Sequence, residues 1–285
     1  MGIFYLKMNP NTELYKNWKY FIKNNSTKEI KRKKLEDIKV IDPCMGSGHI
    51  LVYAFDLLIS FYEEFGYSSR DAAVLILENN LYGFDIDQRA YQLSYFALMM
   101  KARSYNRRIL TQTIRPNIYC IEDKIFAEDF IESVSNGNNS VQNTLKHINS
   151  IYSNSNVYGS LLDVTNLDKE ELESLKDYLD NYVKQDTNDL LSILNKEIVK
   201  DGVQPIIQCS LALKQKYDCV ITNPPYLNSS LMPKELKDFL NKNYSDCKSD
   251  IFAAFIKKCI KFTSKNGYVG MITLMSGCLY QATKN

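Results

Sequence analysis

The most constraining feature of this sequence is a regular alternation of short apolar runs and longer amphipathic stretches between residues 38 and 123. The runs typical of strands lie at 38–44, 80–86 and 117–123, and the stretches with helical periodicity lie at 49–65, 68–80 and 87–108. Strands that alternate with helices form a parallel sheet with right-handed crossover connections. We therefore expect an α/β fold with a doubly wound, mostly parallel sheet.

The same pattern returns near the end of the chain, after an interruption. A helix is expected at 204–215, a fourth strand at 217–223, a helix over 248–267 with Gly267 as its C-cap, and a fifth strand at 268–276. Asp87 and Asp250 are expected to be helix N-caps.

Two segments stand outside the alternation. Residues 1–36 are polar and predict a helical lead-in, so the α/β core is expected to span 37–285. Residues 131–200 are too long for a loop of an α/β unit and predict an insertion. Within it, the Asn- and Ser-rich stretch 131–160 predicts loop, and 168–198 predicts one or two amphipathic helices.

Composition excludes several classes of protein. The net charge of +2 is too small for a chain that binds nucleic acid by charge alone. Seven widely spaced cysteines and only two histidines predict reduced thiols and no metal site. No apolar run approaches the length of a membrane span, and the N-terminus lacks the order of a signal peptide. We expect a cytoplasmic protein with no membrane partner.

A glycine-rich turn, DPCMGSG, joins the first predicted strand to the first helix. Gly46 and Gly48 allow a tight turn and the close approach of a ligand, at the sheet edge where open α/β sheets bind ligands. A dinucleotide site would have a third glycine where Leu51 stands. Asp42 suits an ammonium group better than a pyrophosphate, so a ligand with an amino-acid end and a nucleoside end fits best. A plain glycine turn is the alternative.

Further carboxylates follow the second and third strands. Asp85 lies at a strand tip, where a carboxylate can accept both hydroxyls of a ribose. Glu122 or Asp123 could line the adenine end of the same ligand, and ordinary surface carboxylates are the alternative.

The fourth strand ends in Asn223-Pro224-Pro225-Tyr226. Two prolines stiffen the chain, so the Asn223 side-chain oxygen and the Pro224 carbonyl could accept both hydrogens of a planar amine and expose its lone pair. Tyr226 could stack on the ring that carries the amine. This chemistry is positional and electrostatic, and it needs no acid–base residue. The alternative is a proline turn with a packed tyrosine.

Together and in this order, DPCMGSG, GFDID and NPPY resemble the gamma-type adenine-specific DNA methyltransferases. Longer stretches in 38–58, 75–103 and 223–256 are similar to the PglX methyltransferases of BREX phage-defence systems. The resemblance implies a class I, Rossmann-like methyltransferase fold that uses S-adenosylmethionine. It implies roles for the residues matched to its motifs: Asp42, Pro43, Gly46 and Gly48 at the methionine part, Asp85 at the ribose, and Asn223, Pro224, Pro225 and Tyr226 at the target base.

The resemblance also implies substrates and partners. It implies methylation of a flipped adenine in double-stranded DNA, marking host DNA as self, and other BREX components as possible partners. PglX-type proteins are several times longer and carry a C-terminal region that reads DNA. A complete fold of this class has two strands beyond the fifth, so we expect a sheet incomplete at its C-terminus. A non-catalytic remnant that binds the cofactor or a partner is one alternative. A methyltransferase for a protein glutamine amide or an RNA base is another.

Overall fold

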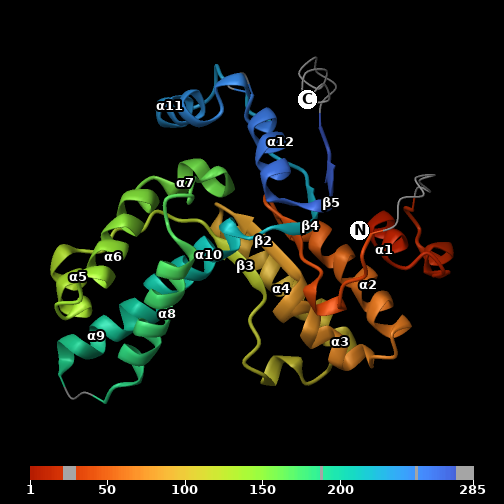
Figure 1. Cartoon of the computed structure of the whole chain (residues 1–285), viewed down its shortest axis with the longest axis horizontal. Helices are drawn as coiled ribbons and strands as arrows, with labels where there is room; N and C mark the ends of the chain where they lie inside the picture. The colour runs from red at the N-terminus through yellow and green to blue at the C-terminus, as the bar shows by residue number, and fades with distance from the viewer. Residues whose placement is uncertain (22–29, 187–188, 248–249, 274–285) are drawn as a thin grey trace. The chain divides into compact units, whose positions relative to one another are not determined.

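The computed structural model describes residues 1–21, 30–186, 189–247 and 250–273, and the chain divides into two compact units (Figure 1). The first unit comprises Met1–Cys120 and Lys216–Asn285, and the second comprises Ile121–Gln215. The insertion predicted at 131–200 lies inside the second unit.

A five-stranded sheet forms the centre of the first unit, in the order β3-β2-β1-β4-β5. All four ladders between neighbouring described strands are parallel, which confirms the predicted fold class. The strands are β1 (Val40–Asp42), β2 (Leu81–Asp85), β3 (Asn117–Cys120), β4 (Tyr217–Thr222) and β5 (Thr263–Met271). The strand order reverses between β1 and β4, and ligands of doubly wound folds bind at such a reversal.

Helices cover the two faces of this sheet. Val40 and Cys219 belong to the buried cluster that the sheet shares with α1, α2, α3 and α4. On the other face, Phe262 of α12 packs against Tyr217 and Phe84 at ring-centroid distances of 5.8 and 6.4 Å. The helices of this unit are α1 (Gly2–Met8), α2 (His49–Glu64), α3 (Ser69–Leu75), α4 (Gln88–Tyr105), α11 (Lys234–Asn243) and α12 (Ile251–Phe262).

Short 3₁₀-helical and π-helical turns connect these elements. The 3₁₀ turns are Leu14–Asn17, Leu35–Asp37, Ile109–Thr111 and Ser245–Cys247. A π-helical turn, Ile76–Asn80, follows α3 and leads into β2.

The predicted C-cap at Gly267 is wrong. Helix α12 ends at Phe262, and Gly267 lies inside β5. The register between β4 and β5 shifts between Tyr217 and Cys219. A Cβ at Gly267 would lie 2.9 Å from the backbone oxygens of Tyr217 and Asp218, so a glycine is needed for the close approach at this irregularity.

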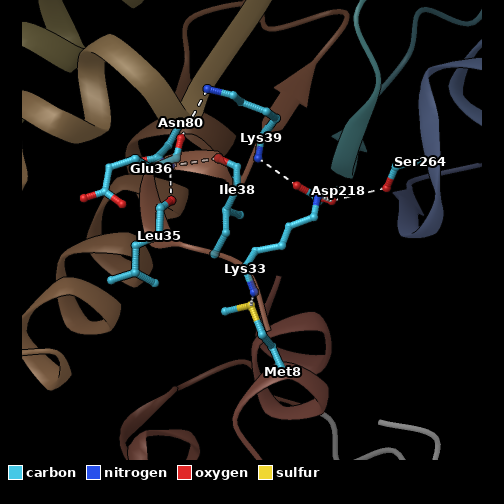
Figure 2. Close-up of polar contacts among 9 residues, drawn as sticks. All are labelled: Met8, Lys33, Leu35, Glu36, Ile38, Lys39, Asn80, Asp218 and Ser264. Carbon is cyan, nitrogen blue, oxygen red and sulfur yellow. Dashed lines mark hydrogen bonds and ion pairs between the residues drawn. The ribbon is translucent and has the colours of Figure 1, made fainter. Parts of the chain in front are cut away.

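A polar cluster around the buried Asp218 and Asn80 lies at the amino ends of β1 and β4 (Figure 2). The Asp218 carboxylate accepts hydrogen bonds from Lys33 Nζ at 2.6 Å, from the Lys39 backbone N–H at 3.0 Å and from Ser264 Oγ at 3.2 Å. Asn80 donates to the carbonyl oxygens of Leu35 and Ile38. The segment that precedes β1 is thereby anchored to three other strands, β2, β4 and β5.

The second unit is helical. Its elements are α5 (Glu128–Ser135), α6 (Asn139–Tyr152), α7 (Ser155–Tyr158), a 3₁₀ turn (Gly159–Leu161), α8 (Lys169–Lys184), α9 (Leu190–Ile198), a π-helical turn (Val199–Val203) and α10 (Gln204–Lys214). The helices predicted at 168–198 and 204–215 are confirmed as α8, α9 and α10.

The loop predicted at 131–160 is wrong, because α5, α6 and α7 occupy most of it. Asn138 caps α6 through hydrogen bonds from the backbone N–H groups of Ser140 and Val141. Leu145 and Ile148 are fully buried on one side of the helix. Many of the asparagines and serines that suggest a loop therefore cap helices or lie on their exposed faces.

Candidate functional site

Two loops meet at the carboxyl edge of the sheet. Strands β1 and β4 pair directly and in parallel, with Val40 opposite Cys219 and Ile41 opposite Val220. The glycine turn after β1 and the Asn223–Tyr226 tip after β4 therefore leave the sheet side by side. Thr222 Oγ1 donates a 2.7 Å hydrogen bond to Asp42 Oδ1, which joins the two strand ends.

Asp42 is completely buried beneath the glycine turn. Its Oδ1 accepts hydrogen bonds from Thr222 Oγ1 and from the Cys44 backbone N–H at 3.0 Å, whereas Oδ2 is buried without a hydrogen-bond partner among the described residues. Burial raises the pKa of Asp42 to about 7, while the Thr222 and Cys44 bonds act in the opposite direction. An unpaired buried carboxylate oxygen is costly, so Oδ2 is suited to a cationic donor from a ligand.

The two glycines of the turn have different surroundings. Gly46 has φ +52° and nothing within 4 Å of the position where a Cβ would stand. Gly48 has φ +81°, and a Cβ there would lie 2.8 Å from Ser94 Oγ and 3.1 Å from Ser94 Cα. Gly46 thus leaves open space beside the turn, and Gly48 allows the start of α2 to approach α4. Pro43 is buried in the same turn.

Asp85, at the end of β2, holds the glycine turn in place. Its Oδ2 accepts a 2.8 Å hydrogen bond from the Gly46 backbone N–H, and its Oδ1 accepts one from the Asp87 N–H at 2.9 Å. Each carboxylate oxygen keeps a second lone pair that a ligand hydroxyl could use. Asp87 caps α4 through the Arg89 N–H, which confirms its predicted place as an N-cap.

The tip after β4 presents Asn223 at the surface, followed by a buried Pro224 and an exposed Pro225. The Tyr226 hydroxyl lies 2.8 Å from the Ile272 carbonyl oxygen and 3.3 Å from Asn223 Oδ1. A tyrosine has one hydroxyl hydrogen, and the shorter contact is the better hydrogen bond. That hydrogen therefore points to Ile272, and Asn223 Oδ1 keeps its lone pairs.

The start of α12 supports the tip. The ring of Tyr226 lies 6.0 Å from that of the buried Phe252, and the Ile251 N–H donates to the Leu227 carbonyl oxygen at 3.1 Å. Asp250 caps the helix through the Phe252 N–H, as predicted. This support could not be predicted locally, because helix α11 separates Tyr226 from Asp250 in the sequence; the Asp-Ile-Phe start of a helix is the signal that marks the supporting element.

Glu122 belongs to the second unit. Its carboxylate pairs with Lys124 at 3.5 Å, and its carbonyl oxygen accepts a hydrogen bond from Ser155 Oγ at 2.6 Å. Its predicted place beside the adenine of a cofactor stays a prediction.

An apolar cavity of about 570 Å³ lies beside the first turn of α2. Its lining is mainly aliphatic and aromatic: Met1, Gly2, Ile3, Trp18, Tyr20, Phe21, His49, Ile50, Tyr53, Ala54, Leu57 and Ile221. None of the described residues that line it is a carboxylate. Within the described ranges, no group of three or more His, Cys, Asp or Glu side chains could hold a metal ion, and no helix is long and apolar enough to cross a membrane.

Comparisons with known proteins agree with this geometry. A family model described as Eco57I restriction-modification methylase matches residues 79–284. The chain is 35% identical over 266 residues to the adenine-specific methyltransferase PglX of Lacticaseibacillus casei (strain Zhang), which covers 90% of this chain and 22% of that protein. It is 35% identical over 263 residues to the adenine-specific methyltransferase BrxX of Escherichia coli O9:H4 (strain HS), which covers 85% of this chain and 21% of that protein.

A third relative is a putative type II restriction enzyme and methyltransferase of Methanocaldococcus jannaschii, RM.MjaORFECS2P. It is 33% identical over 72 residues, which is 23% of this chain and 6% of that protein. The chain spans about a fifth of the length of the two longer matches.

Proposed function

Because the chain belongs to the Eco57I restriction-modification methylase family, we propose that it carries the methyl-transfer site of an adenine-specific DNA methyltransferase. The reaction would move a methyl group from S-adenosylmethionine to the exocyclic amino group of adenine. Both longer relatives are named adenine-specific methyltransferases, which supports this substrate.

One observation carries the proposal: the Thr222–Asp42 hydrogen bond of 2.7 Å between the ends of two paired parallel strands. Because it joins the ends of the two strands, it supports a site in which one small molecule could contact both the glycine turn and the Asn223 tip. A methyl donor at the turn would then have its acceptor at the tip, which is the proximity that methyl transfer requires.

The residues of the turn fit the proposed cofactor, which supplies an electrophilic methyl group on a sulfonium centre when bound. Among the described residues, Asp42 Oδ2 has no hydrogen-bond donor, so it would accept the ammonium group. Less than 1 Å² of this oxygen is exposed, so the turn would have to open locally for the contact to form. Asp85 would accept the ribose hydroxyls. The methionine part would occupy the open space beside Gly46. Pro43 and Gly48 belong to the same turn and would shape this part of the site. Glu122 is proposed for the adenine end.

At the tip, Asn223 Oδ1 and the Pro224 carbonyl would accept the two hydrogens of the target amine. This arrangement favours a pyramidal nitrogen with an exposed lone pair, and the stiffness of Pro224 and Pro225 holds both acceptors in place. The ring of Tyr226, 42% exposed, would stack on the base, a contact worth roughly 1–3 kcal/mol.

An adenine inside a duplex cannot reach this tip, so the substrate would be double-stranded DNA with the adenine flipped out. Other BREX components are proposed as partners because relatives of this chain include PglX. The same proposal places the protein in the cytoplasm, with its DNA substrate.

Incubation of the chain with methyl-labelled S-adenosylmethionine and double-stranded DNA, with RNA and protein supplied in parallel, tests the function. We expect label in N6-methyladenine of DNA, and none with the Asn223→Ala variant. Label confined to protein or RNA would overturn the DNA substrate. Cofactor binding without transfer to any of the three would favour the non-catalytic alternative.

A further inference from the structure

Thr222 is the last residue of β4, and it is buried next to the exposed Asn223. Its hydroxyl is the one side-chain donor to Asp42 within the described ranges, since the other hydrogen bond comes from the Cys44 backbone. The residue therefore touches the carboxylate of the turn on one side and adjoins the tip on the other.

Apart from these hydrogen bonds, few groups near Asp42 stabilise its ionised carboxylate. The Asp85 carboxylate on β2 and the thiols of Cys44 on the turn and Cys259 on α12 are the titratable groups near it. Asp85 disfavours a second negative charge, and the two thiols are neutral because burial raises their pKa values. No described lysine, arginine or histidine forms an ion pair with Asp42.

We propose that Thr222 is a positioning residue: its buried hydroxyl favours the ionised form of Asp42 and orients it for the ammonium group of the cofactor, and so couples the cofactor turn to the target tip. This inference rests on the function proposed above and adds a residue to it. Since a hydrogen bond to a carboxylate favours the charged form, removal of the hydroxyl shifts Asp42 toward the neutral acid at neutral pH. A neutral acid has no charge with which to hold the ammonium group.

The test is a calorimetric titration with S-adenosylmethionine at several values between about pH 6 and 9. Thr222→Val removes the hydroxyl at nearly constant volume, and Thr222→Ser keeps it. For the wild type, affinity is expected to fall roughly tenfold per pH unit below the pKa of Asp42. For Thr222→Val, the fall begins at a pH higher by roughly one unit, so affinity is roughly fivefold weaker near neutrality and roughly tenfold weaker at about pH 6. Thr222→Ser restores the wild-type profile.

Asp42→Asn is the matched control, because it removes the titrating group and keeps an acceptor oxygen. The fall is expected to be absent in this variant, and adding Thr222→Val to it should leave the pH profile unchanged. The α-amino group of the ligand titrates equally for every variant, so it cancels in their ratios. Circular dichroism at each pH checks folding, and Thr222→Ala is the second hydroxyl-free variant if Thr222→Val unfolds.

The outcomes separate the two claims. An upward shift in the hydroxyl-free variant that serine restores supports the positioning role. Profiles of wild type and Thr222→Val that superimpose overturn this role and leave the proposed function standing. A wild type that binds no S-adenosylmethionine at any pH overturns the cofactor assignment itself, and with it both claims.

Discussion

Asp42→Asn is expected to stabilise the fold at neutral and alkaline pH while it weakens cofactor binding. Burial raises the pKa of Asp42 from 3.8 to about 7 in the folded chain, whereas the unfolded chain ionises near the ordinary value. Between these two pH values the unfolded state has lost a proton that the folded state keeps. The stability contributed by this group is therefore complete below the lower value and is lost as the pH rises through the upper one.

The size of the effect follows from the same two pKa values. Stability falls by about 1.4 kcal/mol per pH unit within the window, which amounts to about 3 kcal/mol between about pH 5 and about pH 7. The new amide keeps an oxygen for Thr222 and Cys44 but places an unpaired NH₂ group at Oδ2, at a constant cost of about 1–3 kcal/mol. The difference between variant and wild type should therefore change by about 3 kcal/mol across the window, whatever its constant part.

Urea unfolding of both proteins at successive pH values from about 5 to 8 measures this difference. The variant should gain on the wild type with rising pH and level off above about pH 7, and pH effects of all other groups cancel in the comparison. A free-energy difference that stays constant over the window would refute the reasoning, since it would mean that Asp42 ionises alike in the folded and unfolded chains.

Three further changes test the roles assigned to the turn and the tip. Asn223→Ala should abolish methyl transfer with an unchanged circular dichroism spectrum, whereas the matched Asn228→Ala, five positions on, should retain it; equal activity of the two variants would contradict the role of Asn223. Asp85→Ala should weaken cofactor affinity at least tenfold in calorimetry and cost about 1–2 kcal/mol of stability through its lost backbone bonds; unchanged affinity would remove Asp85 from the site. Gly48→Ala should destabilise the fold more than Gly46→Ala in urea unfolding, because both suffer strain of about 1–2 kcal/mol at positive φ but only the first meets Ser94; equal losses would disprove this packing role.

Much of the first unit could be predicted because its signals are local. The run that contains Val40 and Ile41 reads as a strand, and both residues are buried, one on each face of the sheet. The glycine turn and the proline pair mark the strand ends through their own backbone preferences, which do not depend on tertiary contacts. Asp87 and Asp250 act as N-caps because an N-cap is defined within a few residues of sequence.

What could not be predicted depends on contacts between distant segments. Thr222 contacts Asp42 because β4 pairs with β1, and no local sequence pattern predicts which strand lies next to β1. Gly267 is required by the register shift between β4 and β5, and it does not end a helix. In α6, buried Leu145 and Ile148 outweigh the loop propensity of the surrounding asparagines and serines. Tertiary packing decides each of these cases.

The pairing of β1 with β4 has one more consequence. Neighbouring strands of a ladder stand about 4.8 Å apart, and neither can move without breaking the sheet. The spacing between the glycine turn and the Asn223 tip, at the point where each leaves the sheet, is thus set by the pairing of β1 with β4. For the function proposed above, surfaces that bind the nucleic acid could change with a new recognition sequence, whereas the spacing of the two loops would stay fixed by the strand pairing.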